Sequence, residues 1–203
     1  MNFKDVVSKR RSVNFFDPNR ELDLKIFEEI INEAVLAPSA FNLQPWEIIA
    51  VRSPEAKEKL FTACNQPKIK EASMTLILVG DTFGYGRDNP MWNIKIDLGL
   101  KEDKVTQLIN MCETVLYPTE VKRNAMAVRD VSLLAMTIML CAKDHGVDTH
   151  PMIGFNEDKV KELFDIDEDK TVVMLLSIGY FDESKTLNPR ERRLNFNEIC
   201  TVV

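Results

Sequence analysis

The chain has 203 residues, of which 45% are hydrophobic and 29% charged, and its net charge is −6 at pH 7. This composition excludes a disordered chain, and the acidic balance argues against nucleic-acid binding because no basic stripe could neutralise phosphates. The length suits a single domain over residues 1–203 with a substantial core.

Helical periodicity and capping residues predict two helices before the first strand. Asn2 can cap a helix that ends at Arg10, and Asp23 can cap a second helix that runs to about Ala37, where Pro38 stops it. The remaining predicted elements are strands over 46–51, 74–79, 147–149 and 171–178 and helices over 54–63, 102–116, 121–145 and 157–164. This order is helix-rich with few strands, which favours an α+β fold.

Residues 83–101 are predicted to be the least regular part of the chain and to form a lid region. Gly84 and Gly86 follow a strand, as in a dinucleotide-binding fingerprint, but the third glycine is missing. Pro90 should also break the helix that such a site requires. We therefore expect no Rossmann site.

Cysteine and histidine usage predicts a reduced, cytoplasmic protein without a metal site. The four cysteines form no C-x-x-C pair, and the two histidines have no zinc-like spacing to a cysteine. The N-terminal residues do not resemble a signal peptide. The apolar run 131–142 has about a dozen residues, too few to span a bilayer, so we expect no membrane partner.

Two segments combine small, polar and basic residues. In 10–18, two arginines, a hydroxyl and an aromatic pair could hold a phosphate and one face of a planar ring. In 36–46, small residues let a flat ligand approach the backbone, and two prolines stiffen the chain. Taken alone, the first segment also fits a solvated helix end and the second a rigid connection.

Together, the patterns R-R-S-x-x-x-F-D and A-P-S-x-x-N-x-Q-P-W resemble the nitroreductase family of FMN-dependent oxidoreductases. The likeness continues, in the family's order, through 65–68, 151–155 and 189–192, so it runs nearly end to end. It implies a central, mainly antiparallel sheet flanked by helices. It also implies an intertwined homodimer with FMN sites at the interface, and the apolar end of the C-terminal arm 187–203 agrees with a partner surface.

The resemblance implies which residues hold the flavin noncovalently. The phosphate and ribityl chain would meet Arg10, Arg11, Ser12, Arg190 and Arg192. The flavin ring would meet Asn65 and Lys68 at its polar edge, the backbone of Ile153 and Gly154 near N5, and Pro38, Ser39, Ala40 and Asn42 from the other subunit.

One position departs from the family's pattern. Many members carry Lys or Arg where this chain has Asn14, so one positive charge near the flavin is absent. Lys68 would then be the main cation that stabilises the reduced ring. His150, beside an apolar strand, is more typical of a structural histidine than of a proton donor.

The resemblance implies hydride transfer from NAD(P)H through flavin N5 to a nitroaromatic, a quinone or a similar small acceptor, in a ping-pong scheme. No catalytic side chain is implied, because the cofactor carries the chemistry. Candidate acceptor contacts are Phe41, Tyr85 and Trp92. Two alternatives remain open. One is a specialised flavin enzyme of the same fold, of the reductive dehalogenase or flavin-destroying type; the other is a flavin-binding or sensory module without turnover.

Overall fold

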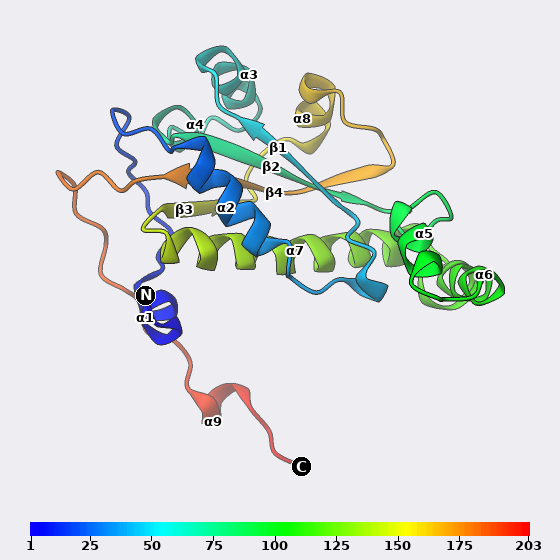
Figure 1. Cartoon of the computed structure of the whole chain (residues 1–203). Coiled ribbons are helices and arrows are strands. Elements are labelled where there is room, and N and C mark those ends of the chain that lie inside the picture. Colours follow the sequence, from blue (N-terminus) through cyan, green and yellow to red (C-terminus); the bar gives the residue numbers. More distant parts are fainter.

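The computed structural model describes residues 1–203 and contains one four-stranded sheet in the order β1-β2-β4-β3, with every pair antiparallel (Figure 1). The strands are β1 (Trp46–Val51), β2 (Met74–Asp81), β3 (Asp148–Met152) and β4 (Lys170–Gly179). The α+β prediction and its three longer strands are therefore confirmed. The predicted strand 147–149 is too short, because β3 continues through Pro151; a proline is tolerated there since β3 is an edge strand.

Nine α-helices, one 3-10 helix (η1) and one short π-helix (η2) accompany the sheet. They are α1 (Phe3–Lys9), α2 (Leu24–Ala34), η1 (Ala40–Asn42), α3 (Pro54–Cys64), α4 (Lys68–Glu71), α5 (Pro90–Asp97), α6 (Glu102–Met111), η2 (Cys112–Leu116), α7 (Glu120–Asp144), α8 (Glu157–Phe164) and α9 (Phe196–Ile199). The predicted caps hold: Asn2 accepts from the Asp5 N–H, and Asp23 accepts from the Lys25 N–H.

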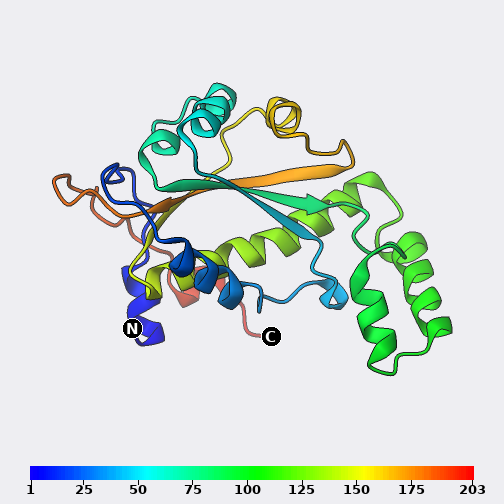
Figure 2. The ribbon, with the colours of Figure 1, turned by 45° about the horizontal axis from the view of Figure 1, so that its top comes forward.

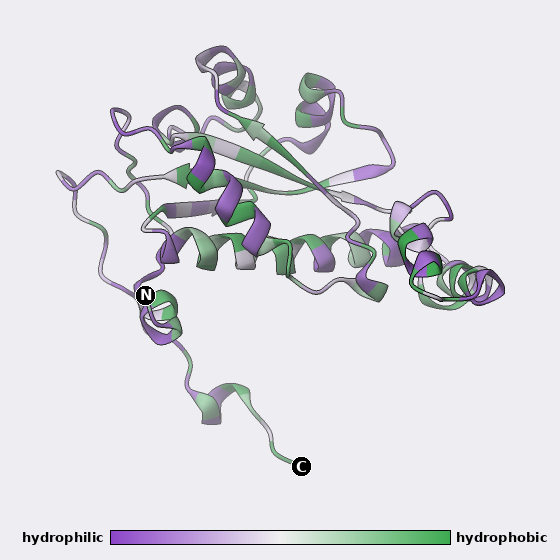
Figure 3. Cartoon of the chain, viewed as in Figure 1, coloured by the Kyte–Doolittle hydropathy of each residue, from purple (hydrophilic) through white to green (hydrophobic).

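The sheet lies between two helical layers, α2 with α7 on one face and α3 with α8 on the other (Figures 1 and 2). Alternate side chains of β2 pack on opposite faces of the sheet. Leu76 and Leu78 belong to the core beneath α7, whereas Ile77 and Val79 belong to the core beneath α3 and α8. This double coverage explains why β2 is apolar throughout. In Figure 3 the side of α2 turned away from the sheet is hydrophilic.

Helix α7 is the central helix of the larger core. By length and hydropathy it is a candidate membrane span, and 50% of its most apolar window is buried inside the protein. Leu134 and Ile138 are fully buried, whereas Leu133 and Met136, on another side, are 42% exposed. Most of the apolar run 131–142 is therefore packed within the chain itself.

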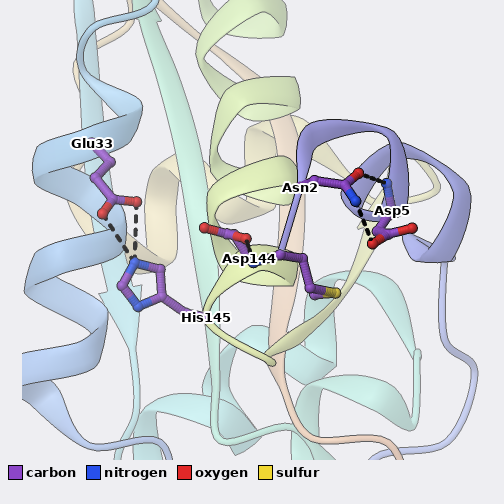
Figure 4. A network of polar contacts seen from close by, with 6 residues as sticks. Asn2, Asp5, Glu33, Asp144 and His145 are labelled. Carbon is purple, nitrogen blue, oxygen red and sulfur yellow. Dashed lines mark hydrogen bonds and ion pairs between the residues drawn. The ribbon is translucent and has the colours of Figure 1, made fainter.

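Polar contacts at the C-terminal end of α7 hold α1 and α2 in place (Figure 4). The Met1 ammonium group lies 2.5 Å from the Asp144 carboxylate. His145 Nε2 lies 3.1 Å from both carboxylate oxygens of Glu33 on α2. These contacts fix the start of the chain beside the last turn of α7.

The region 83–101 is more regular than predicted. Pro90 does not break a helix but occupies the first turn of α5, where its missing N–H costs nothing, and Asn89 caps that helix. Helices α5 and α6 enclose a core of their own, which includes Tyr85, Trp92 and Val105. The expected irregularity is therefore wrong for 90–97, whereas 83–89 and 98–101 contain no helix or strand.

The C-terminal arm 187–203 leaves the body of the protein beyond α1 (Figure 1). Leu194, Phe196 and Ile199 are 57%, 63% and 71% exposed. The last residues are hydrophobic (Figure 3). The arm thus presents apolar side chains that the chain itself does not cover.

Candidate functional site

Four guanidinium groups gather where the first and last segments of the chain meet. Arg190 Nη2 donates to the Arg10 carbonyl oxygen at 3.0 Å, and Arg11 Nη2 donates to the Asn188 carbonyl oxygen at 2.6 Å. Burial lowers the pKa of Arg10, and so do the neighbouring charges of Arg190, Arg193 and Arg11. The fold therefore crowds positive charges that repel one another.

These groups surround a depression of about 310 Å³ without hydrophobic lining. Its lining residues are Arg10, Arg11, Ser12, Asn188, Pro189, Arg190, Glu191 and Arg193. The four arginines outnumber the one carboxylate, so a phosphate dianion would relieve their repulsion and accept bidentate hydrogen bonds. The residues present fit the terminal phosphate of FMN.

Arg192 does not join this arginine cluster. Its guanidinium binds both carboxylate oxygens of Glu198, at 2.8 and 2.9 Å. The same carboxylate accepts from the Asn195 N–H and completes the capping box of α9. The structure places Arg193 beside the depression instead, so the expected phosphate contact from Arg192 is not what this geometry shows.

The residues predicted for the polar edge of the flavin lie beside the cluster. Ser12 pairs with Thr149 of β3 through a parallel bridge. His150 Nδ1 lies 2.8 Å from the Val13 carbonyl oxygen, which can only accept, so Nδ1 carries the proton. Burial and the charge of Lys68 lower the pKa of His150. Lys68 therefore lies near His150, and the hydrogen bond ties His150 to the backbone next to Ser12.

Ile153 and Gly154 continue this surface directly after β3. Ile153 is 81% exposed, and a Cβ atom on Gly154 would meet no heavy atom within 4 Å. The Asn156 N–H donates to the Ala63 carbonyl oxygen at 2.9 Å, which holds the segment beside the end of α3, where Asn65 has a φ of 51°. No contact within the chain requires glycine at 154, so its open space is available to a ligand.

The segment 38–42 lies elsewhere in the same chain, toward the N-terminal half of α7 (Figure 1). Phe41, Asn42 and Gln44 have positive φ angles of 54°, 53° and 52°. Each non-glycine residue in this region costs about 1–3 kcal/mol, least for asparagine. Ser39 Oγ accepts from the Gln44 N–H at 2.9 Å and closes the turn. The loop is therefore strained, polar and tightly held.

Two of the three residues predicted to contact the acceptor, Tyr85 and Trp92, are buried in the core. Trp92 is fully buried and Tyr85 is 4% exposed, and the Trp92 indole N–H donates to the Tyr85 carbonyl oxygen at 3.0 Å. Both belong to the α5–α6 core, so neither side chain is presented on the surface of this chain. Phe41 is half-buried, with its ring centroid 6.5 Å from that of Trp92.

The sequence-based prediction missed Asp130 of α7. Its carboxylate oxygens lie 3.2 and 3.3 Å from the Ala40 backbone nitrogen, and the residue is 4% exposed. Burial raises the pKa of Asp130, and the hydrogen bond from Ala40 opposes this shift. The available signal was its position on the core face of α7, three residues after Ala127 and four before Leu134.

Comparison with known proteins relates the chain to one family. A family model described as "Nitroreductase family" matches residues 7–180. A Bacillus subtilis protein named "Putative NAD(P)H nitroreductase MhqN" is 34% identical over 202 residues, which cover 97% of this chain and 96% of that protein. The "CLA biosynthesis enone reductase" of Lactiplantibacillus plantarum is 32% identical over 184 residues, 86% of this chain and 83% of that protein.

One solved structure bears on the cofactor. It is described as a "putative nitroreductase in complex with FMN" from Exiguobacterium sibiricum. It superposes with a TM-score of 0.87 at 29% identity and covers 99% of this chain and 97% of its own.

Proposed function

This chain belongs to the nitroreductase family and is an FMN-dependent NAD(P)H oxidoreductase, and we propose that it works by a ping-pong scheme in a homodimer. NAD(P)H would bind first and leave oxidised, and a small acceptor would then take its place. One observation carries the proposal: the fold crowds four arginines around a polar depression with a single carboxylate.

FMN, when bound, supplies a two-electron carrier that takes hydride at N5 and passes it on. In our proposal Arg10, Arg11 and Arg190 hold its phosphate, with Arg193 as a fourth cation. Lys68 stabilises the negative charge that reduction places on the polar edge of the ring. The exposed backbone at 153–154 lies where the ring can approach closely. These residues bind and orient, and none has to move a proton.

We propose that each site takes residues from two chains. The segment 38–42 and the arginine cluster lie apart in one protomer, so a flavin bound at the cluster would meet the segment of a partner. The uncovered apolar side chains of the C-terminal arm and of α7 support a large interface. The same soluble dimer would work in the cytoplasm, which agrees with its four free cysteines.

The acceptor in this proposal is a small, electron-poor molecule such as a nitroaromatic or a quinone. The relative named as an enone reductase supports a wider class that includes activated carbon–carbon double bonds. Hydride acceptance requires a centre of low electron density next to a withdrawing group, and these classes share that feature. The half-buried Phe41 is the remaining candidate for an acceptor contact.

The test of this proposal begins with the chromophore. Purified protein should be yellow, and denaturation should release FMN, identified by chromatography. Light scattering over a dilution series should give about twice the chain mass, and flavin should be lost where monomers appear. Release of FAD, or a monomer that keeps its flavin, would contradict the proposal.

A further inference from the structure

The strained loop at residues 39–44 is held by two side chains that lie outside it. Asp130 of α7 accepts from the Ala40 N–H. Asn89, at the start of α5, donates from Nδ2 to the Leu43 carbonyl oxygen at 2.9 Å. The loop is thus fixed from both sides, near its start by the core helix and near its end by the α5–α6 hairpin (Figure 2).

Asp130 is an unusual choice for a structural role. A carboxylate has room for about four hydrogen bonds, yet this buried group receives one, from a backbone amide. Besides this bond only the charge of Arg129 favours the ionised form. Burying the carboxylate is therefore expensive, and an apolar residue would pack here at a lower cost. A role for Asp130 in fixing the position of the Ala40 amide would explain why a buried carboxylate is kept here.

Asn89 uses its whole amide group. Besides the bond to Leu43, its Nδ2 donates to the Gly84 carbonyl oxygen at 2.7 Å, and its Oδ1 accepts from the Met91 N–H at 2.9 Å. One side chain therefore joins the loop, the segment after β2 and the first turn of α5. The Gln44 side chain adds a contact to the Met91 sulfur at 3.5 Å. A shift of α5 would accordingly be transmitted to the loop.

We propose that Asp130 and Asn89 are positioning residues of the enzyme: they hold the loop in the strained conformation that meets the flavin of the partner's site. The inference rests on the proposed function, because that function places this loop beside the flavin ring. Positive φ angles at Phe41 and Gln44 persist only where the surroundings impose them. Neither residue touches cofactor or acceptor in this account; both act through the loop.

The experiment compares the holoenzyme with Asp130→Leu, Asp130→Asn and Asn89→Asp. Leucine removes the acceptor oxygens but keeps a side chain branched at Cγ, and asparagine keeps one acceptor oxygen. Asn89→Asp removes both donated bonds but keeps the oxygen that caps α5. Ile138→Ala is the matched control, since Ile138 is fully buried on α7 in a core cluster that contains no residue of the loop.

Two measurements are made on each variant: amide hydrogen exchange of the loop and of β2, and steady-state kinetics with a quinone. We expect Asp130→Leu and Asn89→Asp to speed exchange at Ala40 and Gln44 by about tenfold or more while β2 stays protected. The kcat/KM for the quinone should fall by about tenfold, and Asp130→Asn should recover most of both losses.

Unchanged loop exchange, or an increase no larger than in Ile138→Ala, would overturn the proposal. Faster loop exchange with unchanged kcat/KM would also overturn it, because the loop would then be free to move without consequence for the reaction. The exchange measurement does not depend on flavin. A parent protein that binds no FMN would therefore refute the proposed function separately.

Discussion

The Arg190 guanidinium donates to the carbonyl oxygen of Arg10, which lies 180 residues earlier in the chain, at 3.0 Å. This contact joins the start of the C-terminal arm to the end of α1 and creates the arginine cluster. The arginine-lined depression, our proposed phosphate site, therefore exists only in the folded chain. Its electrostatics depend on which arginine of the arm lies beside it.

We first predict that Arg193 matters more than Arg192 for flavin affinity. Arg193→Gln removes one cation of the cluster, and a lost charge-assisted hydrogen bond costs about 1.5–3 kcal/mol, or about 10–150-fold in the dissociation constant. Arg192→Gln is the control, because Arg192 is engaged by Glu198. Fluorescence titration of apoprotein with FMN measures both. A larger effect from Arg192 would restore the assignment made from sequence.

A second prediction concerns the flavin potential. Lys68→Met should lower the midpoint potential, because the reduced ring loses the cation that stabilises its negative charge. At an effective dielectric constant of about 20 a charge about 4 Å away contributes roughly 4 kcal/mol. After solvent screening about 1–2 kcal/mol should remain, and about 1.4 kcal/mol corresponds to roughly 30 mV for two electrons.

Asn14→Lys should shift the potential in the opposite direction, since it restores the charge that many relatives carry. Redox titration of both variants against the parent protein tests the pair. Shifts of the same sign, or no shift in either, would refute the electrostatic role given to Lys68 and Asn14.

A third prediction follows from the lowered pKa of His150, caused by burial and by Lys68. Well above about pH 6.5 the imidazole is neutral in both the folded and the unfolded chain, so it adds no pH dependence to the free energy of unfolding. As the pH falls through that value, the unfolded chain takes up a proton that the folded chain does not, so the free energy of unfolding decreases.

His150→Asn should make this decrease smaller, by at most about 1 kcal/mol because the group is only half-buried. Urea unfolding of parent and variant at pH 7.5 and about pH 5.5 provides the comparison. An unchanged pH dependence in the variant would show that His150 does not resist protonation.

The fourth prediction is that Trp92 contributes to stability, and not to binding of the acceptor as expected from the sequence. Because Trp92 is fully buried, Trp92→Ala should lower the free energy of unfolding by about 3–5 kcal/mol. Trp92→Phe keeps an aromatic ring and should cost less, about 1–2 kcal/mol for the lost hydrogen bond to Tyr85. Unchanged stability together with an altered Michaelis constant for the acceptor would favour the original prediction.

Local signals in the sequence predicted most of the fold correctly. Asn2 and Asp23 cap their helices as expected, and β1 and α8 have the predicted bounds. These signals succeed because capping and periodicity depend on residues within one or two turns. Pro90 was misjudged because a proline at the first helical position and a proline that ends a helix look alike without the structure.

The candidate site was less predictable, because its parts meet only through tertiary contacts. The family resemblance implies a phosphate contact for Arg192. In the structure Arg192 is hydrogen-bonded to Glu198, and the adjacent Arg193 lines the depression. Asp130 could not be matched to Ala40 from sequence, as the two lie 90 residues apart. Motifs indicate what a segment binds, whereas the supporting residues become visible only when the chain is folded.

Anaerobic stopped-flow mixing of the purified flavoprotein with NADH or NADPH tests the central claim most directly. The account predicts that the visible absorbance of oxidised flavin disappears within the time of one turnover and returns when a quinone or nitroaromatic is added. A protein that holds FMN but keeps its oxidised spectrum with both nucleotides would contradict it and would indicate a flavin-binding module without turnover.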